Sequence, residues 1–227
     1  MKKIVVLTGA GMSAESGLKT FRDSDGLWEN HNVYDVATPE AWERDPEMVL
    51  KFYNERRKQV RDAKPNKAHV ALGKLEEKYD VHIITQNIDD LHERGGSTQV
   101  IHLHGEINKV RSTVDPGLIN ELDHWEMKLG DLCEKGSQLR PHIVWFGEAV
   151  PMIEKAIPIV KMADVVMVIG TSLSVYPAAG LLNYATSSSQ KYYIDPKGFG
   201  DDNHYQFEII KETAGVGVPR LVDQLLQ

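Results

Sequence analysis

Short runs of apolar residues alternate with segments of helical periodicity along most of the chain. The runs predict strands at KIVVLT (3–8), VHIIT (81–85), VIHL (100–103), HIVWF (142–146), DVVMVIG (164–170) and KYYI (191–194). Between the first two runs, apolar residues recur at helical spacing from Asn66 to Tyr79, and asparagine is a residue type that caps a helix start. Strands that alternate with helices are typical of α/β proteins. We therefore expect a mostly parallel sheet with helices on both faces.

Two segments interrupt this alternation. Residues 30–63 have a helical pattern without an intervening strand, and residues 106–141 are polar and irregular. We expect these two insertions to form a second module, called the small module below. The remaining segments, 1–29, 64–105 and 142–227, then form a larger domain around the sheet. Ligands of such sheets bind at the carboxyl ends of the strands, so polar motifs located there are candidates for a binding site.

The composition narrows the classes of function. The chain has 227 residues, 41% of them hydrophobic, and its 26 Lys and Arg against 33 Asp and Glu give a net charge of -7. This balance lacks the excess of positive charge that is typical of nucleic-acid binding. The first apolar stretch is too short for a signal peptide, and no run approaches the length of a membrane span. We therefore expect a cytoplasmic protein that binds neither nucleic acid nor membrane.

The first strand ends in a glycine-rich turn, LTGAGMSAESG (7–17). Gly9, Gly11 and Ala14 fit the spacing G-x-G-x-x-G/A that opens a helix in Rossmann-like nucleotide-binding proteins. In such a turn the backbone approaches a phosphate, and the N–H groups of the helix start favour the anion. A tight turn between a strand and a helix also needs glycine for steric reasons alone. This stretch alone does not distinguish a phosphate-binding turn from a turn that needs glycine only for steric reasons.

Two further strands are followed by polar motifs. QNIDDLH (86–92) brings Asn87 and Asp89 to the end of one strand, where they either face a ligand or cap the next helix. HLHG (102–105) brings His102 and His104 to the end of the next strand, beside a glycine. A histidine in that place is a candidate general base near neutral pH, although most histidines are structural or surface groups.

The order of these motifs is more specific than any one of them. The chain contains GAGMSAESG, TFRDSDGLW, TQNIDDLH, HLHGE, VWFGE and GTSLSVYP in succession. In this order it resembles the sirtuins, the NAD-dependent protein-lysine deacylases, from Ile4 to the final helix. The glycine turn is then similar to the pyrophosphate-binding loop for NAD. The FRDSDGLW segment stands where a hydride-transfer enzyme would continue directly to a second strand.

The resemblance implies a reaction and a set of site residues. Sirtuins cleave the nicotinamide–ribose bond of NAD and transfer the acyl group of a modified lysine to the ADP-ribose. By similarity, His104 is the base that deprotonates a ribose hydroxyl, and Asn87 and Asp89 are further catalytic residues that hold the nicotinamide and its ribose. The implied NAD-binding positions are Gly9, Ala10, Gly11, Met12, Ser13, Phe21, Arg22, Trp28, Gln86, Asn87, Ile88, Asp89, Gly170, Thr171, Ser172, Asp195 and Ala214.

The chain departs from the family pattern at two places. Asp195 stands where sirtuins commonly carry an asparagine, and a carboxylate can accept a hydrogen bond from a ribose hydroxyl but cannot donate one. Family members usually hold a structural zinc ion between two pairs of cysteines. Here Ser112 occupies the place of the first, and Cys133 is the single cysteine of the chain. Since structural zinc needs four nitrogen or sulfur ligands, we expect no zinc.

The resemblance also indicates how the acyl-lysine substrate is bound. The segment IVWFGE (143–148) is similar to the sirtuin segment that takes the substrate peptide as an added strand, with Val144, Phe146 and Gly147 as contacts. A predicted helix from Pro46 to about residue 61 carries Arg56 on its apolar stripe, three residues after Tyr53. From the residues alone, Arg56 either binds an anionic substrate group or snorkels to a local carboxylate.

The surrounding residues resemble one subgroup of sirtuins. FYNERR (52–57) and Ala37 in DVATPE are similar to the bacterial desuccinylase-like subgroup, in which a tyrosine and an arginine recognise succinyl and malonyl lysine. We therefore expect a deacylase for acetyl, succinyl and malonyl lysine, with NAD and acyl-lysine proteins as partners. Two alternatives remain at this stage. One is a mono-ADP-ribosyltransferase, and the other is a module that binds NAD or ADP-ribose without catalysis.

Overall fold

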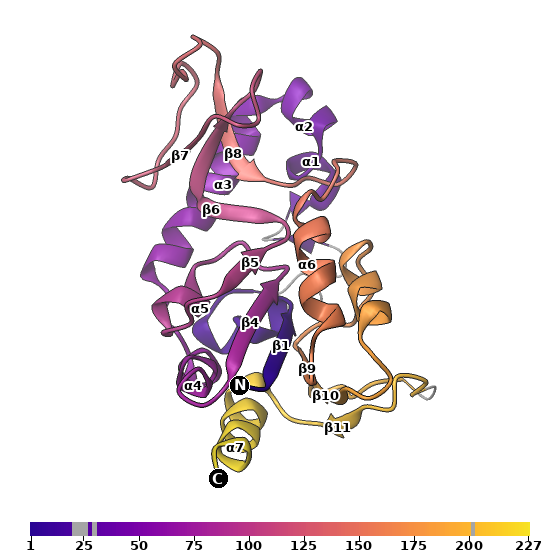
Figure 1. The fold of residues 1–227 in the computed structure, drawn as a ribbon. Coiled ribbons are helices and arrows are strands. Elements are labelled where there is room, and N and C mark those ends of the chain that lie inside the picture. Colours follow the sequence, from indigo (N-terminus) through magenta and orange to yellow (C-terminus); the bar gives the residue numbers. More distant parts are fainter. Residues whose placement is uncertain (20–26, 29–30, 201–202) are drawn as a thin grey trace.

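The computed structural model describes residues 1–19, 27–28, 31–200 and 203–227, with the backbone alone at 27 and 28. Within these residues, six parallel strands form the central sheet in the order β11-β10-β9-β1-β4-β5 (Figure 1). The strands are β1 (Lys3–Thr8), β4 (Asp80–Thr85), β5 (Val100–His102), β9 (Val165–Ile169), β10 (Gln190–Ile194) and β11 (Glu208–Ile210). The expected parallel α/β sheet is confirmed. β11 was not predicted from the sequence.

Both faces of this sheet are covered, which explains why its central strands are continuous apolar runs. Side chains alternate along β1, so Ile4 and Val6 pack in one core and Val5 and Leu7 in the other. The first core includes α4 (Lys67–Leu75) and α7 (Ala214–Leu226), and the second includes α6 (Met152–Lys161) and the 3-10 segment η4 (Ala178–Tyr184). Asn66 caps α4 as predicted, since its side chain accepts from two backbone N–H groups.

The connectivity reverses direction at β1. From β1 the chain builds the sheet outward through β4 and β5, and it then returns to the other side of β1 through β9, β10 and β11. The loops after β1 and β9 therefore leave the carboxyl edge of the sheet in opposite directions. In open α/β sheets, such a point is where ligands bind.

The loop after β1 differs from the expected helix start. It forms two 3-10 turns, η1 (Ala10–Met12) and η2 (Ala14–Ser16), so the prediction of a helix that begins in this loop is wrong. A Cβ atom on Gly9 or Gly11 would lie 2.9 Å from the Gly170 carbonyl oxygen. The N–H of Gly11 donates to that same oxygen at 2.9 Å. The two glycines are therefore required by the close contact between the loops after β1 and β9.

The small module is more regular than the sequence suggested. Residues 105–143 contain a three-stranded antiparallel sheet of β6 (Gly105–Ser112), β7 (Ile119–Glu121) and β8 (Leu139–Ile143) in the order β7-β6-β8. The prediction that residues 106–141 are irregular is therefore wrong. The strand predicted at 142–146 ends at Ile143 and belongs to this small sheet. The first insertion, residues 30–63, is mainly helical as predicted, with α1 (Val33–Val36), α2 (Pro39–Arg44) and α3 (Pro46–Asp62). It also contains the short strand β3 (His31–Asn32), which pairs with β2 (Leu27–Trp28) and was not predicted.

Helix α3 holds the small antiparallel sheet through buried polar side chains. Arg57 is fully buried and donates to the carbonyl oxygens of Ile107 and Trp125, each at 2.7 Å. Asn54 donates to the Met127 carbonyl oxygen at 2.8 Å and accepts from the Met127 N–H at 2.9 Å. These bonds attach β6 and the irregular segment after β7 to the helix.

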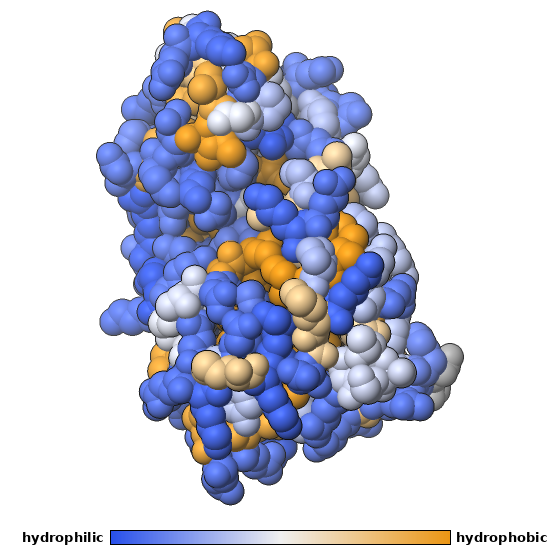
Figure 2. Space-filling view, in the orientation of Figure 1, coloured by the Kyte–Doolittle hydropathy of each residue, from blue (hydrophilic) through white to orange (hydrophobic). Residues whose placement is uncertain are grey.

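A third core joins the small module to the parallel sheet. It includes residues of α1 and α3, the end of β8 and the segment after β4, among them Phe52, Tyr53, Ile88, Ile143 and Trp145. In Figure 1 the small module lies at the end of the molecule away from the two termini. Figure 2 shows hydrophobic side chains over this module and again near the level of β5 and α6. Among the described residues, no helix is both long and apolar enough to span a membrane.

The buried hydrogen bonds of Arg57 generate a stability prediction. Replacing Arg57 by Met leaves two buried carbonyl oxygens without their charged donor, and bonds of this kind contribute about 1.5–3 kcal/mol. We expect a loss of about 3 kcal/mol in unfolding free energy, or about 6–12 °C in Tm for a chain of this size. Differential scanning calorimetry measures the shift, with Lys51→Met on the exposed side of the same helix as the control. Equal melting of the two variants would contradict this role.

Candidate active site

Three buried polar side chains meet at the carboxyl edge of the parallel sheet. The Ser13 hydroxyl donates to Asp89 Oδ2 at 3.0 Å, and Asn87 Nδ2 donates to the Ser13 oxygen at 3.1 Å. The exposed fractions of Ser13, Asn87 and Asp89 are 2%, 8% and 4%. Ser13 comes from the loop after β1, whereas the other two come from the loop after β4. The parallel register of these strands therefore brings predicted residues together from distant parts of the sequence.

The carboxyl group of Asp89 lies in a poorly solvated place. Burial raises its pKa, while the Leu91 N–H, the Ser13 hydroxyl and the positive charge of Arg56 oppose this rise. Asp89 Oδ1 accepts from the Leu91 N–H at 3.2 Å, so the residue also supports the start of α5 (Leu91–Arg94). The capping interpretation and the ligand interpretation of Asp89 are thus compatible, because its two oxygens face different groups.

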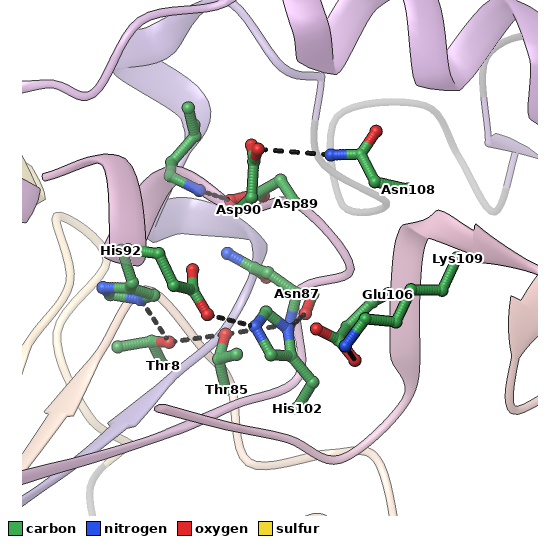
Figure 3. A network of polar contacts seen from close by, with 12 residues as sticks. Thr8, Thr85, Asn87, Asp89, Asp90, His92, His102, Glu106, Asn108 and Lys109 are labelled. Carbon is green, nitrogen blue, oxygen red and sulfur yellow. Dashed lines mark hydrogen bonds and ion pairs between the residues drawn. The ribbon is translucent and has the colours of Figure 1, made fainter. Parts of the chain in front are cut away.

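A second layer of contacts fixes the backbone of Asn87 (Figure 3). The Thr8 hydroxyl donates to Thr85 Oγ1 at 2.8 Å, and that oxygen accepts from the Asn87 N–H at 3.0 Å. The Asn87 carbonyl oxygen lies 3.0 Å from His102 Nδ1, and His102 Nε2 lies 2.8 Å from Glu93 Oε1. Although burial works against the charged ring, the pKa of His102 is raised by its pairing with Glu93. Both ring nitrogens of His102 therefore face acceptor oxygens, an arrangement that favours the protonated ring and indicates a structural role.

His104 has the properties of a base. Its Nδ1 lies 3.1 Å from the carbonyl oxygen of Gln86, and because a carbonyl can only accept, Nδ1 carries the proton. Burial lowers the pKa of His104, so the ring is neutral at pH 7 and Nε2 keeps its lone pair. The two histidines of HLHG therefore differ in charge and in task. Sequence alone could not separate them.

The loop after β9 carries the residues expected at the adenosine end. Gly170 has a φ of 61°, in the left-handed region, and packs on the loop after β1. The Thr171 hydroxyl accepts from Gln86 Nε2 at 3.2 Å, and the Thr171 carbonyl oxygen accepts from the Tyr193 hydroxyl at 2.7 Å. Ser172 is exposed. The loops after β1, β4 and β9 therefore form one continuous edge.

The remaining residues predicted to contact NAD lie partly in loops and partly in hydrophobic cores. Ala10 is half-buried in the loop after β1, whereas Met12 and Ile88 belong to hydrophobic cores. Asp195 is buried after β10, where its side chain accepts from the Lys197 N–H at 3.0 Å. Ala214 is the first residue of α7 and is buried in the first core. Phe21 and Arg22 lie outside the described residues, and Trp28 is described as backbone of β2 alone.

The predicted substrate segment directly follows β8 and contacts both the base and the small module. The Val144 N–H donates to the His104 carbonyl oxygen at 2.9 Å, and the Phe146 N–H donates to the Ala37 carbonyl oxygen at 2.9 Å. Phe146 is 46% exposed, and Gly147 has a φ of 89°. The N–H groups of Val144 and Phe146 are therefore both used within the chain.

An ion-pair network that the sequence did not reveal holds this segment. Arg140 donates to Glu148 Oε1 at 2.7 Å, and its guanidinium carbon lies 3.3 Å from the centre of the Trp145 ring. Glu148 Oε2 accepts from the Trp145 N–H at 2.8 Å, and Arg111 also donates to Glu148. Glu148 stands within the VWFGE motif, but no sequence signal connects it to arginines 8 and 37 residues away.

Tyr53 and Arg56 of α3 lie in the interior, as their helical spacing predicted. Tyr53 is fully buried, and its hydroxyl oxygen accepts from the Trp145 indole N–H at 3.0 Å. Arg56 is 7% exposed and donates to Gln59 Oε1 at 3.2 Å. Its charge acts on the Asp89 carboxyl group, so Arg56 lies on the side of α3 that faces the polar cluster.

The residues at the family's zinc position do not fit a metal ion. Cys133 Sγ lies 3.3 Å from the Ser112 hydroxyl oxygen and 3.1 Å from that of Ser137. These hydrogen bonds lower the pKa of the Cys133 thiol to about 7. One thiol and two hydroxyls do not supply the nitrogen and sulfur ligands of structural zinc. Throughout the described ranges, no group of three or more His, Cys, Asp and Glu side chains is placed to hold a metal.

Comparisons with known proteins agree with this arrangement. A family model described as the Sir2 family matches residues 9–177. The chain is 52% identical over 229 residues to an NAD-dependent protein deacylase of Helicobacter pylori, covering 100% of this chain and 99% of that protein. It is 52% identical over 231 residues to a protein of the same name from Bacteroides thetaiotaomicron, with the same coverage.

Solved structures resemble the fold over almost its whole length. A Sir2 homologue in complex with ADP-ribose has a TM-score of 0.90 at 41% identity, covering 99% of this chain and 92% of that chain. A Sir2 homologue in complex with NAD has a TM-score of 0.90 at 40% identity, covering 99% and 90%. A Sir2 protein with a deacetylated peptide and an O-acetyl ADP-ribose has a TM-score of 0.83 at 32% identity, covering 97% and 92%.

The serine and cysteine cluster generates a prediction about metal content. We expect the purified protein to contain no stoichiometric zinc, because its hydrogen bonds take the place of metal ligands. Elemental analysis measures zinc per chain, and EDTA is expected to change neither Tm nor activity. One zinc ion per chain would contradict this account. It would direct attention to Asp123, His124 and Glu126 as substitute ligands.

Proposed function

The chain belongs to the Sir2 family, and we propose that it is an NAD-dependent protein-lysine deacylase. The observation that carries this proposal is His104, a neutral histidine whose Nε2 keeps its lone pair. Its ring is bonded to the carbonyl oxygen of Gln86, which directly precedes Asn87 of the buried cluster with Ser13 and Asp89. A module that binds NAD without catalysis has no need of such a base. The relatives named NAD-dependent protein deacylase and the neighbours solved with NAD or ADP-ribose support the same function.

The donor set at the sheet edge fits NAD. A carboxyl group, an amide and a hydroxyl buried together suit ribose hydroxyls and the nicotinamide amide, because each can pair with a hydrogen-bonding group of the ligand. Asn87, Asp89 and Gln86 would hold the nicotinamide ribose, and the loops after β1 and β9 would hold the diphosphate and adenosine. Bound NAD supplies the ADP-ribosyl group that accepts the acyl group and releases nicotinamide. We propose that the other residues predicted to contact NAD from the sequence are also NAD-binding residues.

The residues of the chain perform the proton transfer and the orientation. Nε2 of His104 would take a proton from a ribose hydroxyl, while the Gln86 carbonyl holds the ring in the required tautomer. Val144, Phe146 and Gly147 would orient the substrate peptide beside this base, since Val144 is bonded to the His104 carbonyl. The neighbour solved with a deacetylated peptide and an O-acetyl ADP-ribose supports this division of roles.

We further propose that the enzyme accepts acidic acyl groups, namely succinyl and malonyl, besides acetyl. Tyr53 is a buried phenol and Arg56 a buried guanidinium, and they lie one helical turn apart on α3. The charge of Arg56 acts on the carboxyl group of Asp89. A phenol and a guanidinium together suit a carboxylate.

The division into two domains supports the position of this site between them. We propose a larger NAD-binding domain of residues 1–29, 64–105 and 142–227, and a small module of residues 30–63 and 106–141. The separate parallel and antiparallel sheets support a division into two parts, although β8 (Leu139–Ile143) continues past the proposed limit at residue 141. A cytoplasmic location stays a prediction from the sequence.

One assay tests the function. The protein is incubated with NAD and an acyl-lysine peptide, and the products are identified by mass spectrometry. Formation of nicotinamide, unmodified peptide and O-acyl-ADP-ribose together would demonstrate deacylation. Peptide that gains ADP-ribose while keeping its acyl group would indicate ADP-ribosyl transfer, and intact NAD would indicate a binding module.

Loss of the base generates the next prediction. His104→Ala is expected to reduce kcat by about 10²-fold or more, within the usual range for general-base catalysis. Because burial lowers the pKa of His104, the unmutated enzyme should keep its activity down to pH 6.5 and lose it only at lower pH, as the ring becomes protonated. Steady-state kinetics across this range measure both effects. Near-normal turnover in the variant would remove His104 from the mechanism.

Arg56 generates a prediction on acyl selectivity. Arg56→Met keeps most of the aliphatic side chain but loses the charge, so desuccinylation should weaken by at least about 1.5 kcal/mol, or about tenfold in kcat/KM. The loss on an acetyl peptide of the same sequence should be much smaller. Competition between the two peptides in one reaction measures the ratio. An equal loss on both would mean that Arg56 is structural.

A further inference from the structure

Trp145 lies within the proposed substrate segment, but its side chain is buried. Trp145 is 2% exposed, whereas the neighbouring Phe146 is 46% exposed. The indole N–H donates to the Tyr53 hydroxyl oxygen at 3.0 Å across 92 residues of sequence. This bond connects the segment that contacts the peptide with the helix that carries the proposed acyl-binding residues.

The bond fixes the role of the Tyr53 hydroxyl group. An indole N–H can only donate, so the Tyr53 oxygen must accept from it. The hydrogen of Tyr53 is then directed away from Trp145, toward a different acceptor. Burial raises the pKa of Tyr53, so the phenol keeps this hydrogen over the whole working range of pH. Tyr53 is therefore a hydrogen-bond donor on the side of its hydroxyl group that faces away from the indole.

Trp145 is itself held firmly. The Arg140 guanidinium covers its ring at 3.3 Å, and the Trp145 N–H donates to Glu148 at 2.8 Å. Arg140 and Glu148 are joined to each other at 2.7 Å. A charged group stacked on a desolvated indole attracts the ring electrostatically, so the ring has little freedom to turn. The position of the indole N–H is thus determined before any substrate binds.

We propose that Trp145 is a positioning residue for acyl selectivity, which holds the Tyr53 hydroxyl as a hydrogen-bond donor toward the carboxylate of a succinyl or malonyl group. The inference rests on the proposed function and on the acidic acyl groups in particular. An acetyl group has no carboxylate, so it gains nothing from the oriented hydroxyl. Trp145 touches no reacting atom and acts through Tyr53.

A double-mutant cycle tests this role. Trp145→Phe keeps an aromatic ring under Arg140 but removes the N–H, and Tyr53→Phe removes the hydroxyl. We measure kcat and KM for succinyl and acetyl peptides of one sequence with the two single variants, the double variant and the unmutated enzyme. Trp125→Phe, an exposed tryptophan of the small module, is the control for loss of an indole.

Trp145→Phe should lower the succinyl-to-acetyl ratio of kcat/KM by about threefold to tenfold, the effect of one hydrogen bond, mainly through KM. In the Tyr53→Phe background the same change should lower the ratio no further, because its target is gone. Equal losses on both substrates, or additive effects in the double variant, would overturn the inference.

Two other outcomes are also decisive. If Trp145→Phe does not fold, an unchanged ratio in Tyr53→Phe alone overturns the inference, and a reduced ratio supports it. If the unmutated enzyme deacetylates but never desuccinylates, the inference falls together with the proposed acyl range, while the deacylase function stands. Absence of both reactions would contradict the proposed function itself.

Discussion

The hydroxyl of Ser13 joins the two loops on which the site depends. It accepts from Asn87 and donates to Asp89, so three polar groups that would be costly to bury singly satisfy one another. The contact exists because β1 pairs with β4 in parallel, with Thr8 opposite Thr85, and the chain leaves both strands at the same edge. The base, the ribose contacts and the peptide contacts that we propose are all arranged around this edge.

Buried arginines hold the parts of the small module together and join it to the substrate segment. Arg57 attaches α3 to the backbone of the antiparallel sheet, and Arg140 attaches β8 to Glu148 in the substrate segment. Both guanidiniums are buried, and both satisfy several acceptors at once. The same helix that anchors the module through Arg57 carries Tyr53 and Arg56 on another side. Stability and the proposed acyl recognition therefore depend on one element.

The strands that were predicted best from the sequence are those of the parallel sheet that are buried on both faces. β1, β4, β9 and β10 are continuous apolar runs because helices cover both faces of the sheet, and this pattern is readable without a structure. It predicted the small sheet poorly because β7 is exposed at all three of its residues and offers no apolar run. The glycine turn after β1 led to a wrong prediction of a helix start for a different reason. Gly9 and Gly11 serve the contact with Gly170, a steric requirement that resembles a helix start in sequence.

Part of the candidate site could be predicted because its residues follow strands of the parallel sheet. Asn87, Asp89 and His104 follow strands directly, so their placement at the carboxyl edge follows from the fold. The charge of His102 depends on Glu93, and the position of Trp145 depends on Arg140 and Tyr53, which are contacts between distant segments. No spacing in the sequence encodes them. Resemblance to a family supplied residue roles, but it did not supply these partners.

The central claim is that the edge around Ser13 binds NAD, and calorimetric titration tests it most directly. NAD is titrated into the unmutated protein and into Ser13→Ala, with Tm measured for both to verify folding. The account predicts binding to the unmutated protein and at least about tenfold weaker binding to the variant, because Asn87 and Asp89 lose the group that aligns them. Equal affinity of the two proteins for NAD would contradict it.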